Sequence, residues 1–104
     1  MTDIHTTTQT RTALVATDTP VRWAKQLASH LGRKMTVEQT PQGPHLTMTF
    51  EGDEATCLMD TTAADTLGLH VSSANESAAD RMAHVVGSHL ERFGEKVGLQ
   101  VIWA

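Results

Sequence analysis

The sequence predicts an α+β domain in which both helices pack on one face of a largely antiparallel sheet. Three observations lead to this fold class. Apolar residues recur at helical spacing in two segments, and the segments between them alternate apolar and polar residues as strands do. The turns that join these strands are too short for parallel neighbours. The expected order is β-α-β-β-β-β-α-β, folded as a two-layer sandwich.

The first strand is expected over residues 10–17, which are rich in β-branched and apolar side chains. Thr19 then suits the N-cap of a helix, and Pro20 suits its first position, where the missing N–H costs nothing. The helix should run from Pro20 to Leu31 and end at Gly32 in a left-handed conformation. Its apolar stripe consists of Ala24, Leu27, Ala28 and Leu31.

Four short strands should follow, over residues 35–40, 45–50, 55–60 and 66–72. Both helices need an apolar sheet face to cover, so the opposite face is expected to be open and rich in Thr and His. Ile102 and Val15 interrupt that polar pattern. Their exposure would favour dimerisation through the open face over a plain solvent-facing surface or a ligand-binding one.

The second helix is expected to open at Ser73 and Glu76, whose spacing is that of a capping box. Its apolar stripe continues to Phe93 at helical spacing, and a following glycine ends it. Residues 99–103 alternate again and are expected to form a closing strand.

Residues 1–9 are polar and are expected to be a disordered arm before a single domain at residues 10–104. The formal net charge of −4 argues against binding to nucleic acid or to a membrane surface. The lone Cys57 rules out an internal disulfide. Because the sequence offers no signal peptide and no apolar stretch long enough to span a bilayer, a cytoplasmic protein is expected.

A five-residue pattern, S-H-L-x-R, occurs twice, at residues 29–33 and 88–92, each time near the predicted C-terminal end of a helix. The two halves therefore resemble one strand–helix unit used twice, which would give a pseudo-two-fold arrangement; chance similarity is the alternative. The pattern makes His30 and His89 the candidates for chemistry. They could form a pair that binds a ligand or a metal or transfers protons. Alternatively, each is a half-buried structural histidine bonded to backbone.

Other common kinds of site are not predicted. Metal-ligand spacing and nucleotide-binding motifs are missing, so no metal site and no catalytic residue is assigned. Cys57 lies in the middle of a predicted strand, where a buried structural thiol is expected rather than a nucleophile.

Three segments together resemble a bacterial family catalogued as a domain of unknown function, number twenty-two eighteen: residues 29–34, 88–93 and 99–103. The resemblance covers nearly the whole chain from Thr12 onward. Where members of that family often have a second histidine, this chain has Arg33. Some members are encoded beside siderophore-interacting flavoproteins and iron-uptake genes. The resemblance thus implies an accessory role in iron or haem handling, and it supplies no catalytic residues.

The leading hypothesis is therefore a small binding or accessory protein rather than an enzyme. A small anionic ligand, such as a ferric siderophore or a haem propionate, would meet five side chains near the helix ends. These are His30, Arg33, Lys34, His89 and Arg92.

Two alternatives belong to other classes. An enzyme that uses one of the two histidines as a general base predicts a deep pocket lined by both rings and by Cys57 or a carboxylate. A non-catalytic, dimerising interaction module predicts no pocket and a large apolar patch on the open sheet face.

Overall fold

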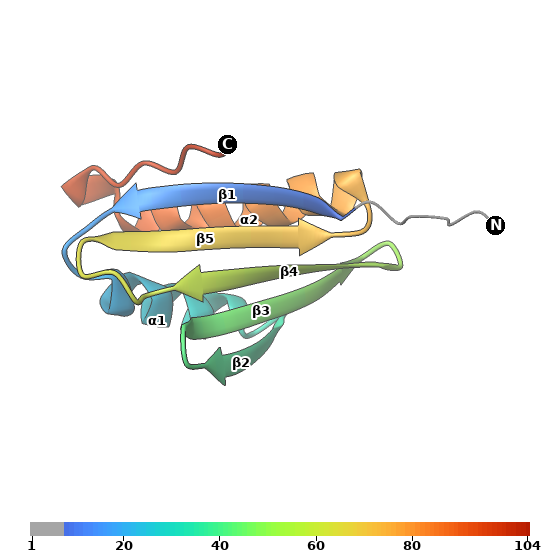
Figure 1. Ribbon diagram of the computed structural model, residues 1–104, viewed down its shortest axis with the longest axis horizontal. Coiled ribbons are helices and arrows are strands. Elements are labelled where there is room, and N and C mark those ends of the chain that lie inside the picture. Colours follow the sequence, from blue (N-terminus) through green and yellow to red (C-terminus); the bar gives the residue numbers. More distant parts are fainter. Residues whose placement is uncertain (1–7) are drawn as a thin grey trace.

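The computed structural model describes residues 8–104, and it confirms the α+β fold with both helices behind one sheet (Figure 1). Helices α1 (Pro20–Leu31) and α2 (Glu76–Phe93) cover one face, and a single 3₁₀ turn, η1 (Glu95–Val97), follows α2. The strands form one antiparallel sheet in the order β1-β5-β4-β3-β2. Their bounds are β1 Gln9–Ala16, β2 Thr36–Thr40, β3 Gly43–Phe50, β4 Asp53–Asp60 and β5 Thr66–Ser73.

The domain begins slightly before the expected boundary. Residues 1–7 of the arm expected over 1–9 lie outside the described residues, whereas Gln9 already pairs with Ser73 in the sheet. None of the helices in residues 8–104 combines the length and the apolar character that crossing a bilayer requires.

Tight turns make the middle strands antiparallel neighbours, as expected. Phe50 pairs with Asp53, so only Glu51 and Gly52 lie between β3 and β4. Both have positive φ angles, of 51° and 88°. Positive φ at both central positions is the geometry of a type I′ hairpin turn, whose twist matches that of the strands.

The core lies between the inner sheet face and the apolar stripes of both helices. Every residue of the predicted α1 stripe is buried, and Trp23 is buried with them. The α2 stripe is graded: Met82, Val86 and Leu90 are fully buried, whereas His89 and Phe93 are half-buried at its edge. The largest fully buried side chains join both layers: Leu27, Leu46, Met59, Leu67, Leu69, Met82 and Leu90.

The start of α1 lies where the sequence predicts it, but by a different mechanism. Thr19 occupies the N-cap position and makes no side-chain cap bond. The hydroxyl of Thr17 instead accepts a hydrogen bond from the Thr19 N–H at 3.1 Å.

The end of α1 also differs from the prediction. Gly32 is right-handed, with φ −61°, so the expected left-handed cap is wrong. A Cβ at this position would lie 2.8 Å from the Ala28 carbonyl oxygen and 3.3 Å from Val37. The backbone of the last helical turn, with β2 packed beside it, therefore leaves no room for a Cβ at this position.

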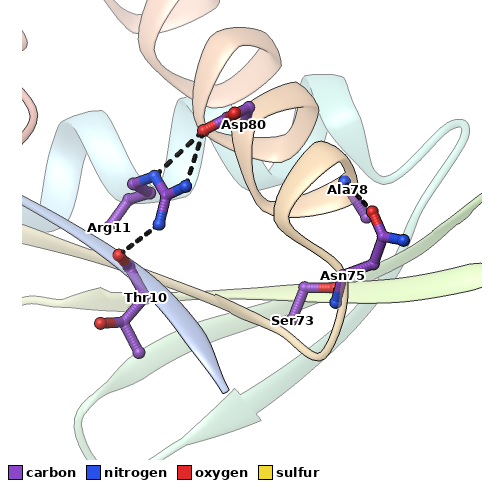
Figure 2. Close-up of polar contacts among 6 residues, drawn as sticks. All are labelled: Thr10, Arg11, Ser73, Asn75, Ala78 and Asp80. Carbon is purple, nitrogen blue, oxygen red and sulfur yellow. Dashed lines mark hydrogen bonds and ion pairs between the residues drawn. The ribbon is translucent and has the colours of Figure 1, made fainter. Parts of the chain in front are cut away.

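Asn75, rather than Ser73, caps α2 (Figure 2). The Asn75 Oδ1 accepts a hydrogen bond from the Ala78 N–H at 2.9 Å. The buried Ser73 hydroxyl donates to the Glu54 carbonyl at 2.7 Å and accepts from the Asn75 N–H at 3.1 Å. Ser73 thus ties the turn to β4 instead of closing a capping box.

An ion pair joins the edge strand β1 to α2. The Arg11 guanidinium, on the inner face of β1, contacts Asp80 Oδ1 at 2.9 and 3.0 Å and donates to the Thr10 carbonyl at 2.8 Å (Figure 2). The Asp80 side chain is 61 % exposed. Solvent therefore screens the pair, and its role is mainly to orient the two elements.

The closing segment runs alongside β1 (Figure 1), but it does not form a ladder over residues 99–103. Thr12 and Ala104 exchange two backbone hydrogen bonds, of 2.9 and 3.4 Å. Such an exchange is the antiparallel pairing pattern. The Trp103 side chain packs over Gly87 of α2, where a Cβ would lie 3.0 Å from the indole nitrogen.

The open sheet face is rich in hydroxyl groups. The strand register aligns one hydroxyl from each strand in a single row: Thr10, Ser72, Thr56, Thr47 and Thr36. His70 and His45 flank Leu58 in the next row, which separates them by two strand spacings as expected. Val15 does not interrupt this face, because it points into the core with 1 % exposure; its neighbour Leu14 is the exposed residue.

Candidate functional site

The structure brings His30 and His89 together, although 59 positions separate them in the sequence. His30 lies in the last turn of α1 and His89 lies one turn before the end of α2. Their ring centroids are 5.1 Å apart, and the ring planes are tilted by 42°. Both side chains are half-buried. The repeated S-H-L-x-R pattern therefore supplies two imidazoles to one place between the helices.

A backbone hydrogen bond selects the tautomer of the neutral His89 ring. Its Nδ1 lies 2.6 Å from the Val85 carbonyl oxygen. Because a carbonyl can only accept, Nδ1 carries the proton, and in the neutral ring Nε2 keeps a free lone pair. The Nδ1 atom of His89 thus makes the backbone hydrogen bond that a structural histidine would make. The Nε2 atom can still bind a ligand.

Phe93 forms the third side of the cluster. Its ring meets His30 edge-on with centroids 5.1 Å apart, and it lies 6.4 Å from His89. Phe93 follows His89 by four positions, so helical spacing places both on one face of α2. The Phe93 ring therefore packs against the imidazole pair from one side.

The three predicted cations do not share a single hollow with one another. The Arg33 N–H lies 3.5 Å from the His30 carbonyl oxygen, so the chain stays close to the end of α1. Arg33 and Lys34 line a hollow of about 570 Å³ that extends over β3 and includes Glu54. Arg92 lines a separate hollow with Glu91 and Glu95. The cations therefore line two different hollows, and neither His30 nor His89 is among the lining residues of either hollow.

A third hollow, with more apolar walls, lies elsewhere, and the sequence patterns did not predict it. It has a volume of about 540 Å³ and lies between α1 and the β2–β3 hairpin. Val21, Val37 and Pro44 supply apolar walls, and Lys25 supplies a positive charge. Val21 is 62 % exposed on the helix. Val21, an apolar residue outside the α1 stripe, was the one sign of this hollow in the sequence. What Val21 faces is visible only once the hairpin is folded.

Cys57 is a core residue, as predicted. It is fully buried in β4, and its burial raises the pKa of the thiol to about 12 despite an opposing backbone hydrogen bond from His70. A thiol with this pKa is not a nucleophile at neutral pH. Cys57 therefore cannot supply the partner that the enzyme hypothesis asked of it.

Asp60 is the other group whose pKa is shifted. Hydrogen bonds from the Thr62 side chain, at 2.6 Å, and from the Thr62 N–H, at 2.9 Å, hold the pKa of its carboxyl below the usual value. The two bonds lie within one turn after β4, so Asp60 has a structural role there. Across residues 8–104, no three His, Cys, Asp or Glu side chains gather as metal ligands.

Comparison with known proteins gives a family and no function. A family model described as an uncharacterised protein conserved in bacteria matches residues 12–104. No curated protein matches this chain.

Proposed function

Since this chain belongs to DUF2218, a bacterial family of uncharacterised proteins, we propose a function from its own side chains. It is a small cytoplasmic protein that binds an anionic, iron-containing ligand. The ligand would contact the His30–His89 pair and the cations around it. The ligand would be a ferric siderophore or haem. The protein would act as an accessory to iron handling rather than as an enzyme.

One observation carries this proposal: the two imidazoles are 5.1 Å apart and come from different helices. Neither local helical spacing nor a shared turn requires that approach. Imidazole and guanidinium groups donate charge-assisted hydrogen bonds to carboxylates and other oxyanions. Arg92 follows His89 by three positions, which puts them on neighbouring parts of the α2 surface.

The ring distance favours a siderophore over haem held by two axial ligands. Two imidazoles on opposite sides of one iron have centroids roughly 6 Å apart, given metal–nitrogen bonds of about 2 Å. The observed 5.1 Å is shorter. Binding of haem would therefore rest on its propionates, whereas an anionic ferric chelate needs no axial pair.

The test is an absorbance titration of the protein with a ferric siderophore and, separately, with haem. We expect saturable binding that weakens about tenfold or more in a His30→Ala/His89→Ala double variant. Arg92→Gln should also weaken binding, because it removes a positive charge beside the pair.

A double variant at two other histidines, His45→Ala/His84→Ala, is the matched control. It removes the same number of imidazoles from the sheet face and from the exposed side of α2, and it should bind as the unchanged protein does. Lack of binding to either ligand, or equal losses in both double variants, would contradict the proposal.

The two alternatives have less support from the side chains. The enzyme hypothesis asks for Cys57 or a carboxylate beside both rings, and the Cys57 thiol lies in the core. The interaction module asks for a large apolar patch on the open face, where a row of five hydroxyls lies instead.

A further inference from the structure

We infer that His30 and His89 bind one transition-metal dication of the zinc class through their imidazole nitrogens. This inference goes beyond the anionic-ligand proposal and does not depend on it, because the ion needs only the two rings. It concerns a site with open coordination positions rather than a closed structural one.

The distance between the rings fits two ligands of one tetrahedral ion. With metal–nitrogen bonds of about 2 Å and tetrahedral angles, two imidazole centroids lie roughly 5 Å apart. The observed separation is 5.1 Å. Aromatic packing alone also gives such separations, since His30 and Phe93 lie 5.1 Å apart as well. The distance therefore permits a shared ion, and a second observation has to point to one.

The hydrogen bond of His89 provides a second, independent observation. Histidines that bind metals commonly donate their other ring N–H to a backbone carbonyl, which fixes the tautomer and orients the ring. The His89 Nδ1 makes this bond to the Val85 carbonyl at 2.6 Å. The inferred ligand atom of His89 is therefore Nε2.

The surroundings determine the class of ion and the type of site. Imidazole suits Zn²⁺, Co²⁺, Ni²⁺ and Cu²⁺ better than Mg²⁺ or Ca²⁺, which prefer oxygen. Residues 8–104 bring no third His, Cys, Asp or Glu to the pair. Water or an added ligand would therefore occupy the remaining positions, as at sites that keep an open position.

The experiment measures binding of Zn²⁺ alone by titration calorimetry, with Co²⁺ absorbance as a second signal. We expect one ion per chain, and about a tenfold or greater loss of affinity in His30→Asn and in His89→Asn. His84→Asn is the matched control, since His84 is an exposed histidine on the same helix, and its affinity should not change.

A measurement on the unchanged protein avoids reliance on variants that fail to fold. Long-range ¹H–¹⁵N NMR spectra should show Zn²⁺ shifting the Nε2 resonance of His89, with its Nδ1 still protonated. Either no stoichiometric Zn²⁺ binding, a shift at other histidines only, or unchanged affinity in folded His30→Asn and His89→Asn would overturn the inference.

Arg92→Gln separates this inference from the proposed function. Removal of a nearby positive charge should leave Zn²⁺ binding unchanged or tighter, whereas it should weaken binding of an anionic chelate. A loss of Zn²⁺ affinity in this variant would count against the metal site. Failure of siderophore and haem binding, with Zn²⁺ binding retained, would overturn only the proposed function.

Discussion

The reactivity of Cys57 is controlled by where its thiol lies. The side chain is fully buried, and the thiol pKa is raised from its usual 9.0 to about 12. We expect no reaction with a thiol reagent at pH 8 until the chain is unfolded by denaturant. Fast labelling of the native protein, measured by reagent absorbance, would show that β4 opens or that the thiol is not buried.

The same pKa shift predicts an alkaline loss of stability. The thiol ionises near pH 9 in the unfolded chain and near pH 12 in the folded one, so the unfolded state loses its proton first. The contribution of Cys57 to the free energy of unfolding should therefore fall by about 1.4 kcal/mol for each pH unit between 9 and 12. Urea titrations of the unchanged protein and of Cys57→Ala isolate the effect, because the variant should lack this slope.

Gly43 is the glycine that the fold most strictly requires. Its φ is +144°, and a Cβ there would collide with the Met59 carbonyl oxygen. Gly43→Ala should lower the free energy of unfolding by about 3 kcal/mol or more.

Gly52→Ala is the control, because Gly52 also has a positive φ, of +88°, but open space around it. Its cost should be only the backbone strain, about 1 to 2 kcal/mol. Equal losses in the two variants, measured by denaturant titration, would mean that the collision with Met59 is relieved by a backbone shift.

At the scale of elements, the two helix starts differ in how they are stabilised. Asn75 caps α2 through its side chain, whereas Thr19 makes no cap bond. Asn75→Ala should therefore cost about 1 kcal/mol of stability. Thr19→Ala should cost less than about 0.5 kcal/mol. Thermal unfolding of both variants checks the order, and a larger loss at Thr19 would show that the caps are wrongly assigned.

Most elements could be predicted from local patterns, because helical and strand spacing are properties of short segments. The predicted bounds of α1 agree with the structure, and the strand bounds agree within one or two residues. The capping prediction at Ser73 failed for a tertiary reason: its hydroxyl is engaged by the Glu54 carbonyl on a neighbouring strand. The closing strand is reduced to one pair of hydrogen bonds because η1 and the contact of Trp103 with α2 direct its path.

For the whole molecule, an apolar contact at the β1 edge is the remaining candidate for self-association. Leu14 is 69 % exposed and Ile102 is 75 % exposed. The hydrogen bonds between Thr12 and Ala104 bring the closing segment to this edge, and each exposed side chain lies two positions from a bonded residue. Of the two apolar residues expected to interrupt the open face, Ile102 is exposed, whereas on β1 the exposed residue is Leu14 and not Val15.

Sedimentation velocity over a range of concentrations tests this dimer hypothesis. The unchanged protein should show a dimer as concentration rises, and Leu14→Asp should stay monomeric. Thr36→Asp, at the opposite edge of the same face, should behave as the unchanged protein does. A monomer at every concentration would rule out the patch as an interface.

The sequence by itself determined the α+β class, the sheet and helix segments, the buried thiol and the choice of His30 and His89 as candidate site residues. Periodicity and repeats are local properties of the sequence, so they could be recognised without the structure. The pseudo-two-fold relation remains a prediction, and the contact between equivalent histidines is what such an axis would produce. Only the tertiary structure decided that the rings lie 5.1 Å apart, that the cations line two separate hollows, and that an apolar hollow forms between α1 and the β2–β3 hairpin. These are distances between elements, and they depend on how two helices pack over a twisted sheet, which no local spacing specifies.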